Sequence, residues 1–368
     1  MRDAFERAPL SLNSSKGASA SSATEPALLP NEGDFGTEAS TSAETRDEGS
    51  ISPSFGTQRP AVAPDAPLIL VALSGGPDSL ALAAATAFEA PRSGIRAGAV
   101  IVDHQLQPGS ADAASSAAEQ AKQLGLDPVL VSIVTVGTEG GPEAAARSAR
   151  YDALDSAARE TGAVAVLLGH THDDQAESVL LGLARGSGPA SLAGMDAATG
   201  RYLRPLLGIP RETTVQACAD AGLEPWLDPQ NDDLAYTRVR VRNTVLPLLE
   251  KELGPGIREA LVRTADQLRE DSDALDHFAE EIAEDLAEHS EAGISLPVRA
   301  LEVQPAALRQ RLIRLAIQSE FHVSISRAQT LEVARLVTDW HGQGAVHLPG
   351  LKVERQGGLL LFSANGVE

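Results

Sequence analysis

The chain contains 368 residues, of which 43% are hydrophobic and 22% charged, and this balance is typical of a soluble globular protein with more than one core. Its 30 basic and 51 acidic residues leave a formal net charge of −21, which argues against a broad basic surface for nucleic acid but not against a local arginine cluster. No apolar run is long enough to span a bilayer and no secretory signal is recognisable, so we expect a cytoplasmic protein without a membrane partner. The single cysteine, Cys218, excludes an intramolecular disulfide and two-cysteine redox or sulfur-relay chemistry.

Residues 1–64 form a low-complexity extension that is rich in Ser, Ala, Thr, Glu, Gly and Pro. Large apolar side chains are few, so burial cannot offset the conformational entropy lost on ordering. We therefore expect this segment to be disordered and dispensable, with a regulatory tail as the alternative.

Residues 65–245 show the alternation of an α/β domain. Short apolar runs predict strands at 68–73, 99–102, 129–134 and 163–168, and helical stretches are expected at 80–89, 111–124, 142–161 and 173–184. Strands that alternate with helices form a parallel sheet covered by helices on both faces, and ligands bind at the carboxyl ends of such strands.

The segment Ser74-Gly-Gly-Pro-Asp-Ser79 joins the first strand to its helix and predicts an anion site. Backbone N–H groups of the turn and the positive end of the helix dipole converge there, and Gly75 and Gly76 permit close approach of a ligand. Ser74 and Ser79 add hydroxyl donors, while Asp78 is suited to hold a metal ion or to fix the turn. The Gly-Lys-Ser/Thr ending of a Walker A loop is absent, and an ordinary strand-to-helix turn is the alternative.

A second polar segment, Gly169-His-Thr-His-Asp-Asp-Gln-Ala-Glu177, follows the apolar run 163–168 and begins a helix at the same edge of the sheet. Asp174 and Glu177 stand three residues apart and share a helix face, so together they can hold an amine cation or Mg²⁺. Acids that are stabilised by the helix dipole are the simpler interpretation, and the spacing fits no standard zinc site.

Arg147 and Arg150 follow Glu143 on neighbouring turns of the expected helix 142–161. They are suited to bind a phosphate or the carboxylate of a small substrate, and exposed salt bridges are the alternative.

Arg238, Arg240 and Arg242 occupy alternate positions further along the chain. In an extended segment all three point the same way, and in a helix Arg238 and Arg242 share a face. Either arrangement concentrates positive charge, with a solvated basic strip as the alternative.

From residue 246 onward the pattern indicates a smaller, mainly helical domain. Apolar residues at helical spacing predict a long helix over 258–289, and two more helices are expected at 305–321 and 326–340. The runs 345–355 and 357–362 predict a short β-hairpin. The histidines of this domain lack metal-ligand spacing, and nothing in it is typical of a catalytic site.

The order of these motifs resembles that of the tRNA(Ile)-lysidine synthetases, a family of PP-loop ATP pyrophosphatases. The loop at 74–79 marks only the superfamily. The family is indicated by the further motifs taken together: Val102-Asp-His-Gln-Leu, Glu143-Ala-Ala-Ala-Arg-x-x-Arg-Tyr, His172-Asp-Asp-Gln-Ala-Glu-Ser, Arg185-Gly-Ser-Gly, Arg204-Pro-Leu-Leu and Asp228-x-x-Asn231. The resemblance covers residues 66–250 and, more loosely, a C-terminal domain without the second C-terminal domain of longer members.

The resemblance implies a ligase that uses ATP and Mg²⁺ to join L-lysine to C2 of the wobble cytidine, position 34, of the isoleucine tRNA with a CAU anticodon. An adenylated cytidine is the implied intermediate, and AMP and pyrophosphate are released. The C-terminal domain is implied to contact the tRNA, and the oligomeric state stays open, with a homodimer as one arrangement.

Roles for particular residues follow from the same resemblance. It places ATP on Ser74, Gly75, Gly76, Pro77, Asp78, Ser79, His104 and Gly169, with Asp78 as a metal ligand; it places lysine on Arg147, Arg150, Asp174 and Glu177; and it assigns catalysis to Asp78, Asp174, Arg238 and Arg242.

Two positions depart from the family pattern, since Val239 stands where an Asn is usual and Gln107 where an Arg is usual. The departures bear on how the tRNA acceptor arm is held rather than on adenylation. Three rival interpretations are a tRNA thiolase, an ammonia-using synthetase and an inactive nucleotide-binding regulator. A thiolase needs cysteines that the chain lacks, and an ammonia user needs no pocket at Asp174 and Glu177.

Overall fold

The computed structural model describes residues 60–365 except 140, 187, 287, 291 and 292, so most of the extension expected to be disordered lies outside the described residues. The chain divides into two compact units. The first comprises residues up to His172 and Ala197–Asn231, and the second comprises Asp173–Asp196 and Asp232–Glu368. Among the described residues, no helix is both long and apolar enough to cross a membrane.

The first unit contains a six-stranded sheet in the order β3-β2-β1-β4-β6-β5. All neighbouring strands are parallel except β5 and β6. The strands are β1 (Leu68–Ala72), β2 (Arg96–Asp103), β3 (Val129–Ile133), β4 (Ala165–Leu168), β5 (Ala198–Thr199) and β6 (Tyr202–Leu203). The chain runs outward from β1 to β3 and then returns to place β4 on the other side of β1. The carboxyl ends of β1 and β4 therefore form the switch point at which α/β sheets bind ligands.

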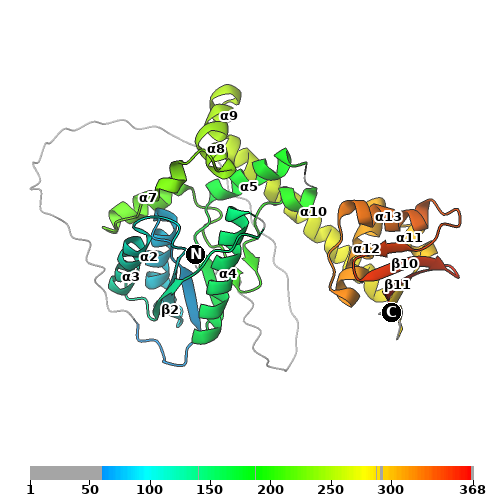
Figure 1. The fold of residues 1–368 in the computed structure, drawn as a ribbon, viewed down its shortest axis with the longest axis horizontal. Coiled ribbons are helices and arrows are strands. Elements are labelled where there is room, and N and C mark those ends of the chain that lie inside the picture. The colour runs from blue at the N-terminus through cyan, green and yellow to red at the C-terminus, as the bar shows by residue number, and fades with distance from the viewer. Residues whose placement is uncertain (1–59, 140, 187, 287, 291–292, 366–368) are drawn as a thin grey trace, which may run out of the picture. The chain divides into compact units, whose positions relative to one another are not determined.

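Helices cover both faces of this sheet, as the alternating pattern predicted (Figure 1). Successive residues of β1 point to opposite faces, so Ile69 and Val71 join one core and Leu68 and Leu70 the other. The first core is completed by α2 (Pro77–Arg92), α3 (Ser110–Gln123) and α7 (Arg211–Asp220), and the second by α4 (Pro142–Thr161). The predicted strands and helices of residues 68–161 are confirmed to within a few residues.

The second unit begins with helices that carry the remaining polar motifs. They are α5 (His172–Ala184), α6 (Pro189–Leu192), α8 (Thr237–Arg240), the π-helical turn η2 (Val241–Val245), α9 (Leu246–Leu253) and α10 (Ile257–Leu286). A short 3-10 turn, η1 (Pro229–Asp232), precedes α8. The long helix expected at 258–289 is α10.

The rest of the second unit packs helices against a five-stranded antiparallel sheet in the order β7-β8-β11-β10-β9. The helices are α11 (Val298–Glu302), α12 (Ala306–Phe321) and α13 (Arg327–Thr338), and the strands are β7 (Glu288–Ser290), β8 (Gly293–Pro297), β9 (Val346–Leu348), β10 (Leu351–Gln356) and β11 (Leu359–Ala364). The expected hairpin is β10 and β11. The expected first strand, 345–355, is divided by a turn into β9 and β10. Strands β7 and β8 were not predicted, because they are only three and five residues long; β8 pairs with β11 and β7 with β8.

Candidate active site

The loop at residues 74–79 is organised by its two serine hydroxyl groups. The Ser79 hydroxyl donates to the Gly76 carbonyl oxygen at 3.0 Å and accepts the Ser74 backbone N–H at 3.1 Å. Gly75 has a φ of +84°, a conformation that favours glycine. Gly76 caps α2 and Pro77 occupies its first turn, so the amino end of a 16-residue helix follows the loop directly. The expected strand–turn–helix arrangement is therefore present, and anion binding at this loop stays a prediction.

The end of β4 packs closely on this loop. A Cβ atom placed on Gly169 would lie 3.1 Å from the Ser79 backbone nitrogen and Cα atom, which is tighter than most Cβ contacts. The structure thus supplies a steric reason for glycine at 169.

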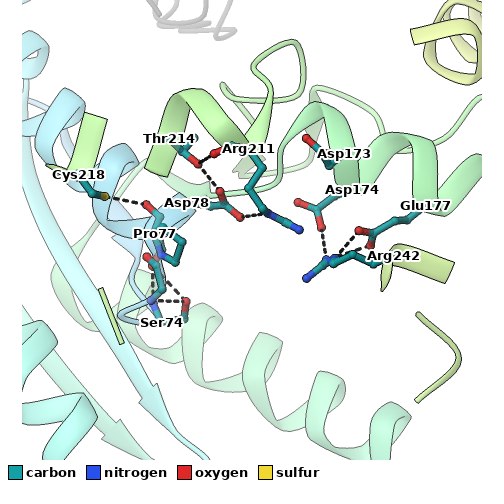
Figure 2. A network of polar contacts seen from close by, with 12 residues as sticks. Ser74, Pro77, Asp78, Asp173, Asp174, Glu177, Arg211, Thr214, Cys218 and Arg242 are labelled. Atoms are coloured by element: carbon teal, nitrogen blue, oxygen red, sulfur yellow. Dashed lines mark hydrogen bonds and ion pairs between the residues drawn. The ribbon is translucent and has the colours of Figure 1, made fainter. Parts of the chain in front are cut away.

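Asp78 is held by α7 (Figure 2). The Arg211 Nε atom donates to its Oδ2 atom at 2.9 Å, and the Thr214 hydroxyl donates to its Oδ1 atom. Both carboxylate oxygens are therefore engaged by the protein. In this arrangement Asp78 links the start of α2 to α7, and its role as a metal ligand stays a prediction. No group of three or more His, Cys, Asp or Glu side chains suited to a metal ion occurs in the described part of the chain.

A cavity of about 320 Å³ opens beside the loop within the first unit. The ends of β1 and β2 line it together with Ser74 and Gly76, and other walls come from His104, Arg150, Trp226, Asp228 and Asn231. Its size and its position at the switch point are suited to part of a nucleotide.

His104, Arg150 and Asp228 are the titratable residues that line this cavity. Burial, the nearby Arg150 guanidinium and the opposing effect of Asp103 together leave the pKa of His104 below its ordinary value. The His104 Nδ1 atom is buried and has no hydrogen-bond partner among the described residues. Burial also lowers the pKa of Arg150, although an arginine remains protonated. The cavity thus pairs a neutral imidazole with a cationic guanidinium.

The segment after α7 forms the remaining wall. The Trp226 backbone N–H donates to the Gly75 carbonyl oxygen at 2.9 Å, which ties this segment to the loop. The Gln107 Nε2 atom donates to the Asp228 Oδ1 atom at 2.8 Å. Gln107, which departs from the family pattern, thus retains a polar contact with the Asp-x-x-Asn motif.

A separate cluster in the second unit joins two carboxylates of α5 to two arginines. The Asp174 and Glu177 residues are 6% and 0% exposed. The Arg238 Nε atom lies 2.8 Å from the Glu177 Oε2 atom, and the Arg242 Nη2 atom lies 3.2 Å from the Asp174 Oδ1 atom. A further contact joins Arg242 Nε to Glu177 Oε1 at 2.5 Å (Figure 2). Two negative and two positive side chains therefore balance one another.

The helical alternative for the arginine-rich segment is the observed one, since Arg238 and Arg242 lie one turn apart in α8 and η2. Arg240 instead donates to the backbone oxygens of Leu234 and Ala235, both at 2.7 Å. It therefore stays outside the cluster.

The four residues expected to bind lysine do not all lie together in the structure. Asp174 and Glu177 lie together, whereas Arg150 lines the cavity of the first unit beside His104. Arg147 is exposed and packs over the Tyr151 ring, with its guanidinium carbon 5.0 Å from the ring centroid. Arg147 therefore lies outside that cavity.

Several residues at this site were given no role from the sequence, although Asp228 and Asn231 belong to a motif that it identified. Arg211 and Thr214 hold Asp78 through contacts across more than 130 residues, which no local spacing reveals. Trp226, Asp228 and Asn231 line the cavity. For these three, the Asp-x-x-Asn motif beside a tryptophan was a usable signal.

Cys218 is buried in α7 and its thiol donates to the Pro77 carbonyl oxygen at 3.3 Å. Burial raises the pKa of the Cys218 thiol to about 11. At neutral pH the thiol is therefore protonated, and it is a poor nucleophile or cluster ligand.

The chain matches two known protein families. Residues 55–249 match the PP-loop domain, and residues 296–361 match the TilS substrate binding domain. Together with the loop and the sheet, the first match defines an ATP-binding enzyme of the PP-loop class.

Similar curated proteins cover most of the chain. A tRNA(Ile)-lysidine synthase from Leifsonia xyli subsp. xyli is 62% identical, over 83% of this chain and 93% of that protein. Those from Thermobifida fusca and Streptomyces coelicolor are each 53% identical, over 82% and 81% of this chain and 93% and 86% of those proteins. The chain belongs to the tRNA(Ile)-lysidine synthase family, whose members are ligases.

Among solved structures, the chain is similar to the U34-tRNA thiolase NcsA from Methanococcus maripaludis with its 4Fe–4S cluster. The identity is 20% and the TM-score 0.46, over 55% of this chain and 72% of that one. This likeness is too distant to bear on function.

Proposed function

We propose that this protein uses ATP to join the ε-amine of L-lysine to C2 of the wobble cytidine in the isoleucine tRNA with a CAU anticodon. In the first step the cytidine O2 atom bonds to the α-phosphorus of ATP and pyrophosphate leaves. In the second step the lysine amine bonds to C2, loses a proton, and AMP leaves with the former O2 atom. Family membership over most of the chain is the observation that carries this proposal.

Residues 65–245 are proposed to carry out the chemistry and residues 246–368 to contact the tRNA. The amino end of α2, which directly follows the loop at 74–79, is suited to stabilise negative charge on the departing pyrophosphate. The neighbouring cavity is proposed to receive the nucleoside of ATP, with Arg150 as its cation. Arg150 is thereby reassigned from lysine to the nucleotide.

Asp174 and Glu177 are proposed to bind the lysine ammonium group. Both already pair with Arg238 and Arg242, so the cluster carries no net charge. An ammonium group therefore binds favourably only if it displaces a guanidinium from one of the carboxylates. Arg238 has the longer contact to Asp174, 3.5 Å against 3.2 Å for Arg242, and is proposed to be the one displaced.

Mg²⁺ is proposed to enter with ATP, bound by the phosphate oxygens. When bound it neutralises phosphate charge. Asp78 is assigned to positioning, because Arg211 and Thr214 already engage its carboxylate.

The decisive experiment incubates the full chain with ATP, Mg²⁺, isotopically labelled lysine and the CAU isoleucine tRNA, followed by mass spectrometry of the tRNA nucleosides. We expect one labelled lysidine per tRNA, and AMP and pyrophosphate in equal amounts. An otherwise identical tRNA with uridine at the wobble position is the control and should take up none. Turnover with ammonia or sulfide but not with lysine would refute the proposal.

A further inference from the structure

A groove of about 350 Å³ in the second unit belongs to none of the sites described above. It lies between α10, α12 and the turn that joins α12 to α13. The side chains of Leu315, Val323 and Ile325 form an apolar wall, and Arg311 and Arg314 project from α12.

The two arginines of the groove differ in their partners. The Arg311 Nε atom lies 2.6 Å from the Asp276 Oδ1 atom, and its Nη2 atom donates to the Ser272 hydroxyl at 3.2 Å. Arg314, one turn further along α12, forms no hydrogen bond or ion pair within the described ranges. Arg311 is thus already neutralised, whereas Arg314 is not.

The surroundings of Arg314 disfavour its charge. Burial lowers its pKa, as do the nearby positive charges of Arg311 and Arg327, and Asp276 offsets this only in part. Burying part of a guanidinium group that has no paired anion costs desolvation free energy. An anion that binds to the guanidinium would offset this cost. The exposed Arg327 begins α13 next to this groove, so its charge adds to the same field.

We propose that this groove binds a backbone phosphate of the tRNA, with Arg314 as the principal contact. The inference rests on the proposed function for the identity of the RNA. Residues 296–361, which include Arg311, Arg314 and Arg327, match a substrate-binding domain. Asp276 and Glu280 also line the groove, but Asp276 is engaged by Arg311, and neither acid forms an ion pair with Arg314 within the described residues.

The chemistry of the groove favours a sugar–phosphate unit over a base-specific contact. A guanidinium binds a phosphate through two parallel hydrogen bonds, and the apolar wall can pack against a ribose. Such a contact positions the RNA without reading its sequence.

The test measures affinity of the full chain for the unmodified tRNA across a series of salt concentrations. For Arg314→Glu we expect binding weaker by about tenfold or more and a slope of log Kd against log salt that is shallower by about one. The matched control is Arg335→Glu on α13, which makes the same change in charge at an exposed residue that pairs with Asp339. We expect a much smaller effect of Arg335→Glu on both the affinity and the slope.

A second variant reverses the sign of the effect. Glu280 lines the same groove with a negative charge, so Glu280→Gln should tighten tRNA binding. Arg314→Lys keeps the positive charge and should retain most of the tRNA affinity of the wild type. Equal Kd values and slopes for Arg314→Glu and Arg335→Glu, or no tightening by Glu280→Gln, would overturn the proposal. Because the assay measures binding alone, a chain that binds tRNA through Arg314 but makes no lysidine would refute the proposed function and leave this inference standing.

Discussion

Glu177 is fully buried in α5 and meets guanidinium groups from two other segments. Helical spacing alone predicted that it would share a face with Asp174. The pairing with Arg238 and Arg242 spans more than 60 residues and depends on how α8 packs against α5. A short-range pattern therefore identified the acids but not the charges that neutralise them.

Replacing one of these acids tests the proposed lysine site. Asp174→Asn keeps the shape but removes one charge, so we expect the KM for lysine to rise by about tenfold or more, while ATP affinity changes little. Steady-state kinetics with each substrate varied in turn measure both. The control is Asp173→Asn, since Asp173 lies next to it in sequence and pairs with Arg258 instead. Equal effects of the two substitutions would contradict the assignment.

His104 gives a pH-dependent signature. The pKa of His104 is lowered in the folded protein. As pH falls, His104 therefore takes up a proton in the unfolded chain before it does so in the folded protein. The free energy of unfolding then decreases between the ordinary pKa and the lower pKa of the folded state. His104→Gln removes this loss. We therefore expect the wild type to lose more stability than the variant between pH of about 7.5 and about 5. Denaturant unfolding at both pH values checks this, and parallel losses would show that His104 is not responsible.

At the scale of elements, α10 owes its start to a side chain of the preceding helix. The Glu250 carboxylate accepts the backbone N–H groups of Gly256, Ile257 and Arg258 at 2.8, 3.2 and 3.1 Å. These groups lack partners within the helix, and a carboxylate at a helix amino end also interacts favourably with the dipole. The hydrogen bonds, above all that from Arg258, lower the pKa of Glu250.

Removing this cap should destabilise the protein. We expect Glu250→Ala to cost about 1 kcal/mol of unfolding free energy at neutral pH. Because the folded pKa is depressed, the contribution is present above the ordinary pKa of a glutamate and is lost as pH falls through the folded value. Urea unfolding should thus show a smaller difference from the wild type in acid. The control is Glu252→Ala, because Glu252 lies in the same helix as Glu250 but pairs with Lys251. It should change the free energy of unfolding little.

Elements with strong periodicity were predicted well and pairing-dependent ones were not. The helices α3, α4 and α12 begin and end within one residue of their expected bounds. Strand β7 has three residues and pairs with β8, and β8 pairs with β11; neither β7 nor β8 was predicted. Short strands depend on partners distant in sequence, which a local pattern does not contain.

At the scale of the whole molecule, the described hydrophobic cores draw on residues from Leu68 onward. A chain that begins at Pro60 retains every residue of these cores and the contact of Arg96 with the Pro64 carbonyl oxygen. We expect the shortened chain to keep the melting temperature of the full chain. Its rate of lysidine formation should lie within about twofold of that of the full chain. A parallel assay of both chains measures this, and a large loss of either quantity would contradict the expectation.

The sequence by itself determined the class of this protein, because an anion-binding loop between a buried strand and a helix is a local feature, and the motifs that mark the family are short and ordered along the chain. Tertiary structure alone decided what each motif contacts: Asp78 pairs with Arg211, Arg150 lines the same cavity as His104, and Asp174 and Glu177 pair with arginines. The physical reason is that electrostatic pairing depends on distance in space, which periodicity along a chain does not encode.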